Sequence, residues 1–141
     1  DQKVFMMYKF RTMIIDTPVV ETDLLDHSSS YITKFGRFLR MTSLDELPQI
    51  FNVIIGQMSL VGPRPALPNQ VDLNKARLAM GVSSHKPGIT GLAQIKGRDN
   101  LSLDDKVSFD QLYCHKQSLL YDARIIISTV IKIISRSNIS H

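Results

Sequence analysis

The alternation of apolar and polar positions predicts five helices, over residues 31–41, 46–55, 69–80, 103–116 and 119–136. The segment 46–55 has the clearest pattern, because its apolar residues follow the i, i+3, i+4, i+7, i+8 spacing of one helix face. These residues are Leu47, Ile50, Phe51, Ile54 and Ile55. We therefore expect this face to lie in the core, with Gly56 ending the helix. The segment 119–136 holds helical spacing but is rich in isoleucine, so a buried strand is the alternative there.

Two shorter segments have the character of strands. Residues 4–13 combine β-branched and aromatic residues with alternating polarity, and residues 58–61 form a short apolar run. The turn GPRPALP follows the second run, and its three prolines exclude regular structure. Residues 82–98 carry three glycines and three cations and are predicted to be a long functional loop. The predicted class is α+β: a mainly helical single domain, 1–141, with a small antiparallel sheet and interfacial amphipathic helices.

The segment 31–41 is both basic and amphipathic. Serines at 28–30 offer an N-cap for it. Its apolar stripe is Ile32, Phe35, Phe38 and Leu39, and its cations are Lys34, Arg37 and Arg40. One interpretation is a surface helix whose stripe packs in the core. The other is a helix in a membrane interface, with rings at the acyl boundary and cations on head groups.

The amino-acid composition limits the classes of ligand and partner that the protein could bind. A chain of 141 residues has the size of one domain, and its net charge of +4 favours anionic partners such as phosphates or a lipid surface. The single cysteine, Cys114, excludes an intrachain disulfide and a cysteine metal cluster. The four histidines show no metal-ligand spacing. Aromatics are scattered and tryptophan is absent, which argues against a nucleic-acid module.

Membrane contact is expected to be interfacial, or to be made by a segment outside this sequence. No uninterrupted run of about 18 apolar residues occurs, and nothing after Asp1 resembles a signal peptide.

The candidate chemistry centres on the adjacent acids Asp45 and Glu46 in SLDELPQ. Helix capping is one explanation, because Ser43 and Glu46 have the S-x-x-E spacing of a capping box. Asp45 could instead be the cap, with Pro48 in the first turn. In either case Asp45 would lie at the positive end of the helix dipole and stay ionised, as a nucleophile toward phosphorus must. Glu46 would then suit Mg²⁺.

Four cations are candidates for binding substrate phosphates. Arg64 lies between two prolines, so its backbone is set before a ligand arrives. The alternative for PRP is a purely structural turn. Arg98, Lys86 and Arg40 complete the set, although a single cation on a loop is usually only solvated.

Three ordered motifs resemble those of a known family. They are YKFRTM at 8–13, GRFLRMTSLDELPQIFNVIIGQMSLVGPRPAL at 36–67 and KPGITGLAQIKGR at 86–98. The chain resembles the bacterial sugar transferases, the monotopic polyprenyl-phosphate phosphoglycosyl transferases that begin capsule, O-antigen or glycoprotein glycan assembly. Five further residues fall where the family's C-terminal pattern has them: Asp110, Tyr113, Ser118, Asp122 and Thr129.

The resemblance implies an enzyme that moves a sugar-1-phosphate from a UDP-sugar to polyprenyl phosphate. It assigns the nucleophile to Asp45, with release of UMP, and Mg²⁺ binding to Glu46. It places Arg64 and Arg98 in segments used around the phosphates. It also implies location at the cytoplasmic face of the cell membrane and favours a membrane-facing stripe on 31–41. Family members carry an N-terminal re-entrant helix that this sequence lacks. The alternative function is a non-catalytic membrane-surface or partner-binding module.

Overall fold

The computed structural model describes residues 4–15, 17, 28–97 and 100–135. Six α-helices occur in these ranges: α1 Lys34–Thr42, α2 Gln49–Ile54, α3 Val71–Ala79, α4 Leu92–Lys96, α5 Leu103–Lys116 and α6 Leu119–Ser135. Two short strands, β1 Ser59–Val61 and β2 Gly88–Thr90, accompany the 3-10 turns η2 Ser28–Tyr31, η3 Leu44–Glu46 and η4 Val82–Ser84. The mainly helical α+β class is confirmed, and 119–136 is helical rather than a strand.

The sheet is parallel, so the expected antiparallel sheet is wrong. Ser59 pairs with Gly88 and Val61 with Thr90. The reason is the connection: α3 and η4 lie between the strands, and this crossover returns the chain in the same direction. The segment 82–98 is not one long loop, because it holds η4, β2 and α4. These elements are too short to produce a recognisable period.

The N-terminal segment is extended but is not the predicted strand over 4–13. Among the described residues of this segment, the one β-type pairing is an isolated antiparallel bridge between Met13 and Ile32. Asn52 of α2 holds the segment instead: its Oδ1 accepts from the N–H of Tyr8 at 3.0 Å, and its Nδ2 donates to the carbonyl of Met6 at 2.8 Å. The backbone of the N-terminal segment therefore makes these hydrogen bonds with the buried side chain of Asn52 and not with a neighbouring strand.

The orientation of α2 is the reverse of the prediction. The face expected in the core is exposed, with Phe51 at 65% and Ile54 at 73%, while the polar residues Gln49 and Asn52 are buried. The periodicity identified the apolar face correctly but not what lies against it. Polar side chains can be buried here because the N-terminal backbone supplies hydrogen-bond partners to Asn52.

The N-cap of α1 is Thr33 rather than a serine of 28–30. Its Oγ1 accepts from the N–H of Gly36 at 2.9 Å. A Cβ at Gly36 would collide with the carbonyl of Thr12, so glycine lets the N-terminal segment run directly against α1. The apolar stripe is divided: Leu39 is buried, whereas Phe35 and Phe38 are exposed and stack on each other.

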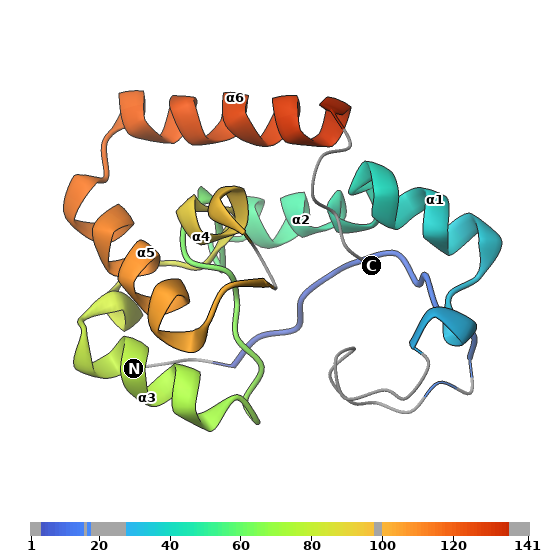
Figure 1. Ribbon diagram of the computed structural model, residues 1–141, viewed down its shortest axis with the longest axis horizontal. Coiled ribbons are helices and arrows are strands. Elements are labelled where there is room, and N and C mark those ends of the chain that lie inside the picture. The colour runs from blue at the N-terminus through green and yellow to red at the C-terminus, as the bar shows by residue number, and fades with distance from the viewer. Residues whose placement is uncertain (1–3, 16, 18–27, 98–99, 136–141) are drawn as a thin grey trace.

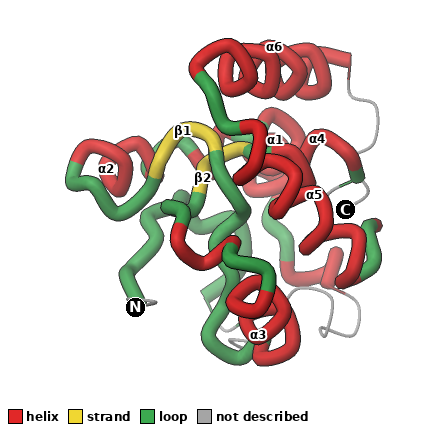
Figure 2. Tube along the Cα trace, turned by 90° about the vertical axis from the view of Figure 1, so that its left-hand side faces the viewer, coloured by secondary structure: helices red, strands yellow, loops and turns green. Residues whose placement is uncertain are grey.

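The core lies where α5 and α6 meet the strands. Its buried side chains are Val61, Leu92, Tyr113 and Ile125. Figure 1 shows α6 along one edge of the molecule, above α4 and α2, with α3 at the opposite edge. The view turned by 90° shows the two strands between α2 and the α4–α5 helices (Figure 2). Within the described ranges, no helix combines the length and apolar character needed to cross a membrane.

Candidate active site

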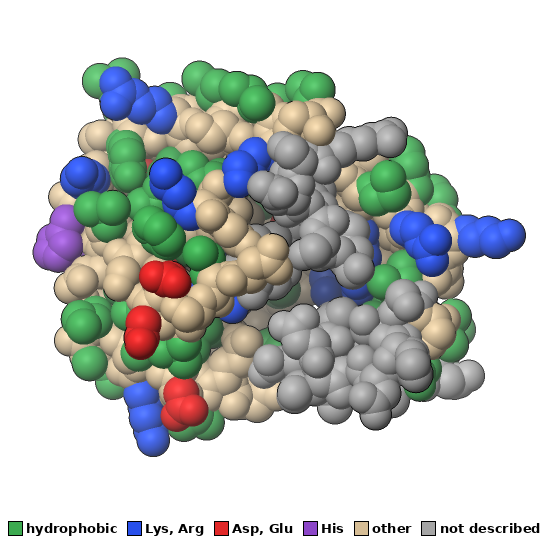
Figure 3. Space-filling view, viewed as in Figure 1, with side chains coloured by type: hydrophobic (Ala, Val, Ile, Leu, Met, Phe, Trp, Pro, Cys, Tyr) green, Lys and Arg blue, Asp and Glu red, His purple; other side chains and the backbone are tan. Residues whose placement is uncertain are grey.

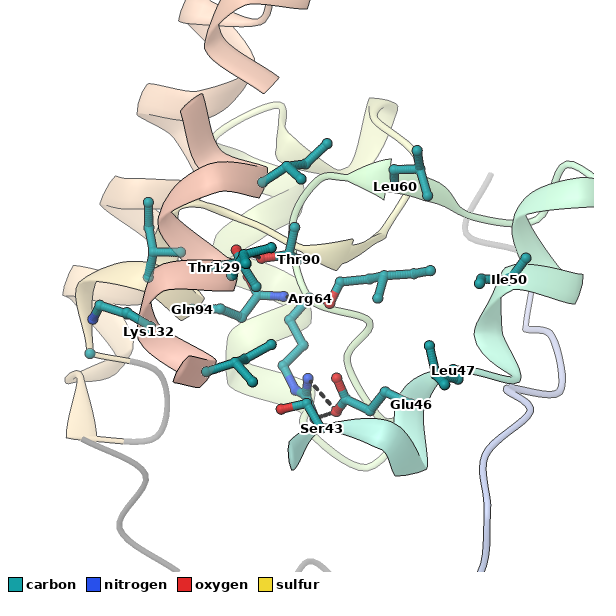
Figure 4. Close-up of a pocket in the computed structure, with 16 residues that line it drawn as sticks. Ser43, Glu46, Leu47, Ile50, Leu60, Arg64, Thr90, Gln94, Thr129 and Lys132 are labelled. Atoms are coloured by element: carbon teal, nitrogen blue, oxygen red, sulfur yellow. Dashed lines mark hydrogen bonds and ion pairs between the residues drawn. The ribbon is translucent and has the colours of Figure 1, made fainter. Parts of the chain in front are cut away.

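A cavity of about 420 Å³ lies between α2 and α6, with the charged pair Glu46 and Arg64 at one end and Lys132 of α6 also in its lining (Figure 4). At that end Arg64 and Glu46 point toward each other, and the two terminal guanidinium nitrogens lie 3.1 and 3.0 Å from Glu46 Oε1. The side chain of Glu46 is 14% exposed and that of Arg64 37% exposed. The pair is therefore partly buried yet reachable from the cavity.

The walls of the cavity are mainly apolar. They include Leu47, Ile50, Leu60, Ile89, Ile95, Ile126, Val130 and Ile133. Several of these side chains are exposed, so the cavity opens onto apolar surface. Polar groups are few: the hydroxyls of Thr90 and Thr129 lie 2.7 Å apart, and Gln94 Oε1 is buried without a hydrogen-bond partner in the described part of the chain. An amphiphilic ligand, apolar with one anionic end, fits such a lining.

Asp45 lies beside the cavity in the 3-10 turn η3, not at the N-terminus of a helix. Both capping predictions are wrong: Ser43 has φ 55° and caps nothing with its side chain, and Pro48 is the residue before α2. Burial raises the pKa of the Asp45 carboxyl above its usual range, and the Glu46 carboxylate adds to the rise. Lys9 and Arg40 oppose it.

The raised pKa replaces the helix-dipole argument for Asp45. A carboxylate that is partly removed from water keeps more of its basicity, and so attacks an electrophile more readily once it is ionised. Lys9 and Arg40 supply the positive charge that favours this ionised form. They also attract anions to the same place.

Replacing Lys9 by methionine should raise the pKa of Asp45 further. The ammonium group stabilises the carboxylate, so its loss favours the protonated form and moves the titration to higher pH. The measurement is a ¹³C NMR titration of the Asp45 carboxyl carbon. Lys34→Met, an exposed lysine on α1, is the control and should leave the titration unchanged. An unmoved midpoint in Lys9→Met would contradict this electrostatic assignment.

The structure distributes the predicted phosphate-binding cations unevenly. Arg64 lies in the cavity, and Arg40 lies near Asp45, with its Nε donating to Thr12 Oγ1 at 2.9 Å. Lys86 is exposed near Gly56, at the far end of α2, and does not line the cavity. Arg98 lies outside the described residues. Arg64 and Arg40 are thus brought to the acid pair.

Among the described residues, no group of three or more acidic, histidine or cysteine side chains could enclose a metal ion. The donors present are the neighbouring carboxylates of Asp45 and Glu46. Mg²⁺ commonly binds one or two carboxylates and completes its shell with substrate phosphates and water. The residues fit a metal shared with a phosphate ligand.

Sequence reasoning missed several residues of this region. Lys9 lies in the segment 4–13, for which the sequence predicts only a strand, and Thr90 and Gln94 lie in a segment predicted to be a loop. Gln94 could have been singled out, because it is a polar residue within the apolar GLAQI run. The contact between Thr90 and Thr129 joins residues 39 positions apart and leaves no local pattern.

Most of the chain is similar in sequence to known proteins. The family profile described as bacterial sugar transferase matches residues 1–136. The chain belongs to the bacterial sugar transferase family. Members similar to it include the galactosyl transferase CpsE of Streptococcus agalactiae, 41% identical over 91% of this chain and 31% of that protein. The UDP-glucose:undecaprenyl-phosphate glucose-1-phosphate transferase of Klebsiella pneumoniae is 42% identical over 94% of this chain and 30% of that protein.

A third family member is the undecaprenyl-phosphate galactose phosphotransferase of Salmonella typhimurium. It is 38% identical over 95% of this chain and 31% of its own length. The chain thus spans about a third of the length of these relatives. The residues that match the family profile include the acid pair, the GPRP turn and α6.

Proposed function

We propose that the protein is a phosphoglycosyl transferase that moves a sugar-1-phosphate from a UDP-sugar to a polyprenyl phosphate. The observation that carries the proposal is the cavity itself: an apolar space for a lipid chain ends at Glu46 and Arg64, directly beside Asp45. The names of the Salmonella and Klebsiella relatives, an undecaprenyl-phosphate phosphotransferase and a glucose-1-phosphate transferase, support the same substrates.

In the first step, a carboxylate oxygen of Asp45 attacks the β-phosphorus of the UDP-sugar. The bond from that phosphorus to the bridging oxygen breaks, and UMP leaves with the bridging oxygen. The sugar phosphate remains on Asp45 as an acyl phosphate. Lys9 and Arg40, whose charges act on Asp45, are placed to attract the diphosphate and to balance charge as UMP leaves.

In the second step, the phosphate of the lipid acceptor attacks the phosphorus held on Asp45. A new diphosphate bond forms and the carboxylate is released. The acceptor's isoprenyl chain would lie along the apolar wall made by Ile50, Ile126 and Val130, and its phosphate would lie at the Arg64 end. Arg64 can hold that phosphate with both terminal nitrogens, in place of its present partner Glu46.

Glu46, with Asp45 beside it, would hold Mg²⁺ together with the donor diphosphate. When bound, the metal would neutralise phosphate charge, so that an anionic carboxylate can approach phosphorus. Occupation of Glu46 by the metal would also release Arg64 for phosphate binding.

The protein would act on the cytoplasmic face of the membrane, lying on the surface through α2 and its neighbours. The apolar face of α2 is exposed, as are Phe35 and Phe38 of α1, and the cations Lys34 and Arg37 are exposed on α1 as well. Figure 3 shows hydrophobic side chains gathered along the edge formed by α6. A basic rim beside apolar rings fits a leaflet that carries anionic lipids.

The test is UMP release from a panel of UDP-sugars by the full-length protein in detergent. We expect one sugar to give Mg²⁺-dependent release that EDTA stops. Without acceptor, release should stop after about one equivalent per enzyme, because the acyl phosphate accumulates. Adding undecaprenyl phosphate should restore turnover. Vesicle binding without UMP release from any sugar would favour the non-catalytic membrane-surface module instead.

A further inference from the structure

Arg77 of α3 is buried, and its guanidinium joins two parts of the chain. Its Nε donates to Asp110 Oδ2 of α5 at 2.9 Å, and its Nη2 contacts the same oxygen. Its Nη1 donates to the backbone carbonyl of Arg64 at 2.8 Å. Arg77 is 8% exposed and Asp110 1% exposed, and neither residue lines the cavity.

The carbonyl that Arg77 holds belongs to a turn with few hydrogen bonds of its own. Pro63 and Pro65 flank Arg64, and neither has an N–H to donate. The carbonyl of Pro63 accepts from the N–H of Gly88 at 2.9 Å, and the carbonyl of Arg64 accepts from Arg77. The turn that carries Arg64 is therefore fixed from β2 on one side and from α3 on the other.

The direction of the Arg64 side chain depends on this fixed backbone. From the turn, the Arg64 guanidinium reaches Glu46 at 3.0 and 3.1 Å in the cavity. A chain of contacts thus runs from Asp110 through Arg77 to the backbone of Arg64, and from the Arg64 side chain to Glu46. A small rotation of the turn would move the guanidinium by a larger distance, because the side chain is long.

Stability alone is a weak reason for this pair. Removing two charges from water is expensive, and the attraction between them repays that cost only when the remaining hydrogen bonds are also satisfied. Asp110 Oδ1 is buried and has no partner among the described residues. Arg77 takes part in this costly buried pair and also binds the carbonyl of Arg64, a residue of the candidate active site. Its contacts therefore suit a residue that fixes the orientation of Arg64.

We propose that Arg77, oriented by Asp110, is a positioning residue that directs the side chain of Arg64 into the cavity. The inference rests on the proposed transferase function, because its purpose is the alignment of phosphate-binding groups. It assigns to the α3–α5 interface a part in the reaction, although no residue of either helix lines the cavity.

The first test is Arg77→Lys in the full-length protein. Lysine keeps the positive charge, but its single ammonium lacks the planar fork that contacts Asp110 and the Arg64 carbonyl together. We expect kcat for UMP release to fall by about 10- to 100-fold, as misplacement of a positioned group does. In an Arg64→Ala background the same change should cost almost nothing further. If the fold-reductions in kcat of the two single variants multiplied in the double variant, the proposal would be overturned, because Arg77 would then act independently of Arg64.

A matched control separates positioning from loss of fold. Val107→Ala removes a buried side chain one turn before Asp110 on the same helix. It should lower the melting temperature but leave kcat per folded molecule unchanged. If Arg77→Lys does not fold, Asp110→Asn, which keeps the shape of the side chain, should show the same fall in kcat and the same non-additivity with Arg64→Ala. Equal kcat in wild type and the folded variant would refute the positioning role.

A spectroscopic readout keeps the inference distinct from the proposed function. The Nε–Hε NMR signal of Arg64 reports the order of its guanidinium without any turnover. Arg77→Lys should shift and broaden this signal, whereas Val107→Ala should not. If the wild type released no UMP from any sugar, the transferase proposal would fail while this measurement would still decide whether Arg77 orders Arg64. An unchanged signal in Arg77→Lys would overturn the inference.

Discussion

Replacing Asp45 by asparagine should lower UMP release by about a thousandfold or more, because the amide cannot form the acyl phosphate. The side chain keeps its size, and Asp45 is attached to its neighbours through its backbone, whose carbonyl accepts from the N–H of Phe10 at 3.0 Å. We therefore expect the variant to stay folded. The measurement is UMP release, with transfer of ³²P from the β-phosphate of labelled UDP-sugar to the protein as the direct assay of the intermediate.

The control for this change is Asp72→Asn, an exposed acid in the first turn of α3. It should label and turn over as the wild type does. Partial burial raises the pKa of the Asp45 carboxyl, so the acid limb of kcat/KM in the wild type should lie above the ordinary pH range of an aspartate. Labelled protein in Asp45→Asn would show that another residue is the nucleophile.

Replacing Phe51 and Ile54 together by serine should weaken binding to anionic lipid vesicles by about 100-fold or more. Both side chains are exposed, so the change removes little packing and the melting temperature should stay within a few degrees of wild type. Each buried large apolar side chain contributes about 1.5–3 kcal/mol, and two of them account for the expected loss. The measurement is co-sedimentation of the full-length protein with phosphatidylglycerol vesicles.

A double change of equal character on α3 is the control. Leu78 and Met80 are 66% and 52% exposed, similar to Phe51 and Ile54, but lie by α3, at the edge opposite α6 (Figure 1). Leu78→Ser with Met80→Ser should leave vesicle binding unchanged. Equal losses in both double variants would mean that binding follows general hydrophobicity. No loss from Phe51 and Ile54 would place the membrane contact elsewhere.

Local patterns predicted the longer helices well. The bounds predicted for the helices over 69–80 and 103–116 lie within two residues of the observed ones, and Ser102 caps α5 by accepting from the N–H of Asp105. These two helices could be predicted because the residues that mark their ends, the cap Ser102 and the glycine Gly81, lie next to them in the sequence. The helix over 119–136 was also correctly preferred to a strand.

The misassigned elements depend on contacts between distant residues. β2 exists because β1, 29 positions earlier, offers it a partner in register, and the three residues GIT are too few to show a period. The prediction of which face of α2 is buried was wrong for a different reason. Hydrophobic periodicity reports which face avoids water, but a protein core and a lipid surface satisfy it equally. The structure excludes the core, because the apolar face is exposed and the amide of Asn52, on the opposite face of α2, is buried.

The residues of the candidate site also differ in whether the local sequence could identify them. The acid pair and Arg64 could be singled out from neighbouring residues, because all three lie in two motifs 18 positions apart. The assignment of Asp45 to a helix N-terminus was wrong, since α2 begins three residues after Glu46. The wall supplied by α6 and the support from Arg77 could not be predicted, because both come from segments whose own sequence pattern gives only a helix.

The position of α6 along the chain has a consequence for how the protein is made. The acid pair and the exposed face of α2 leave the ribosome more than 70 residues before Ile126 and Val130, which close the other side of the cavity. A nascent chain can therefore present its apolar face to the lipid before it has a complete substrate-binding space. Synthesis from the N-terminus would place the chain at the membrane first and make it competent for chemistry last.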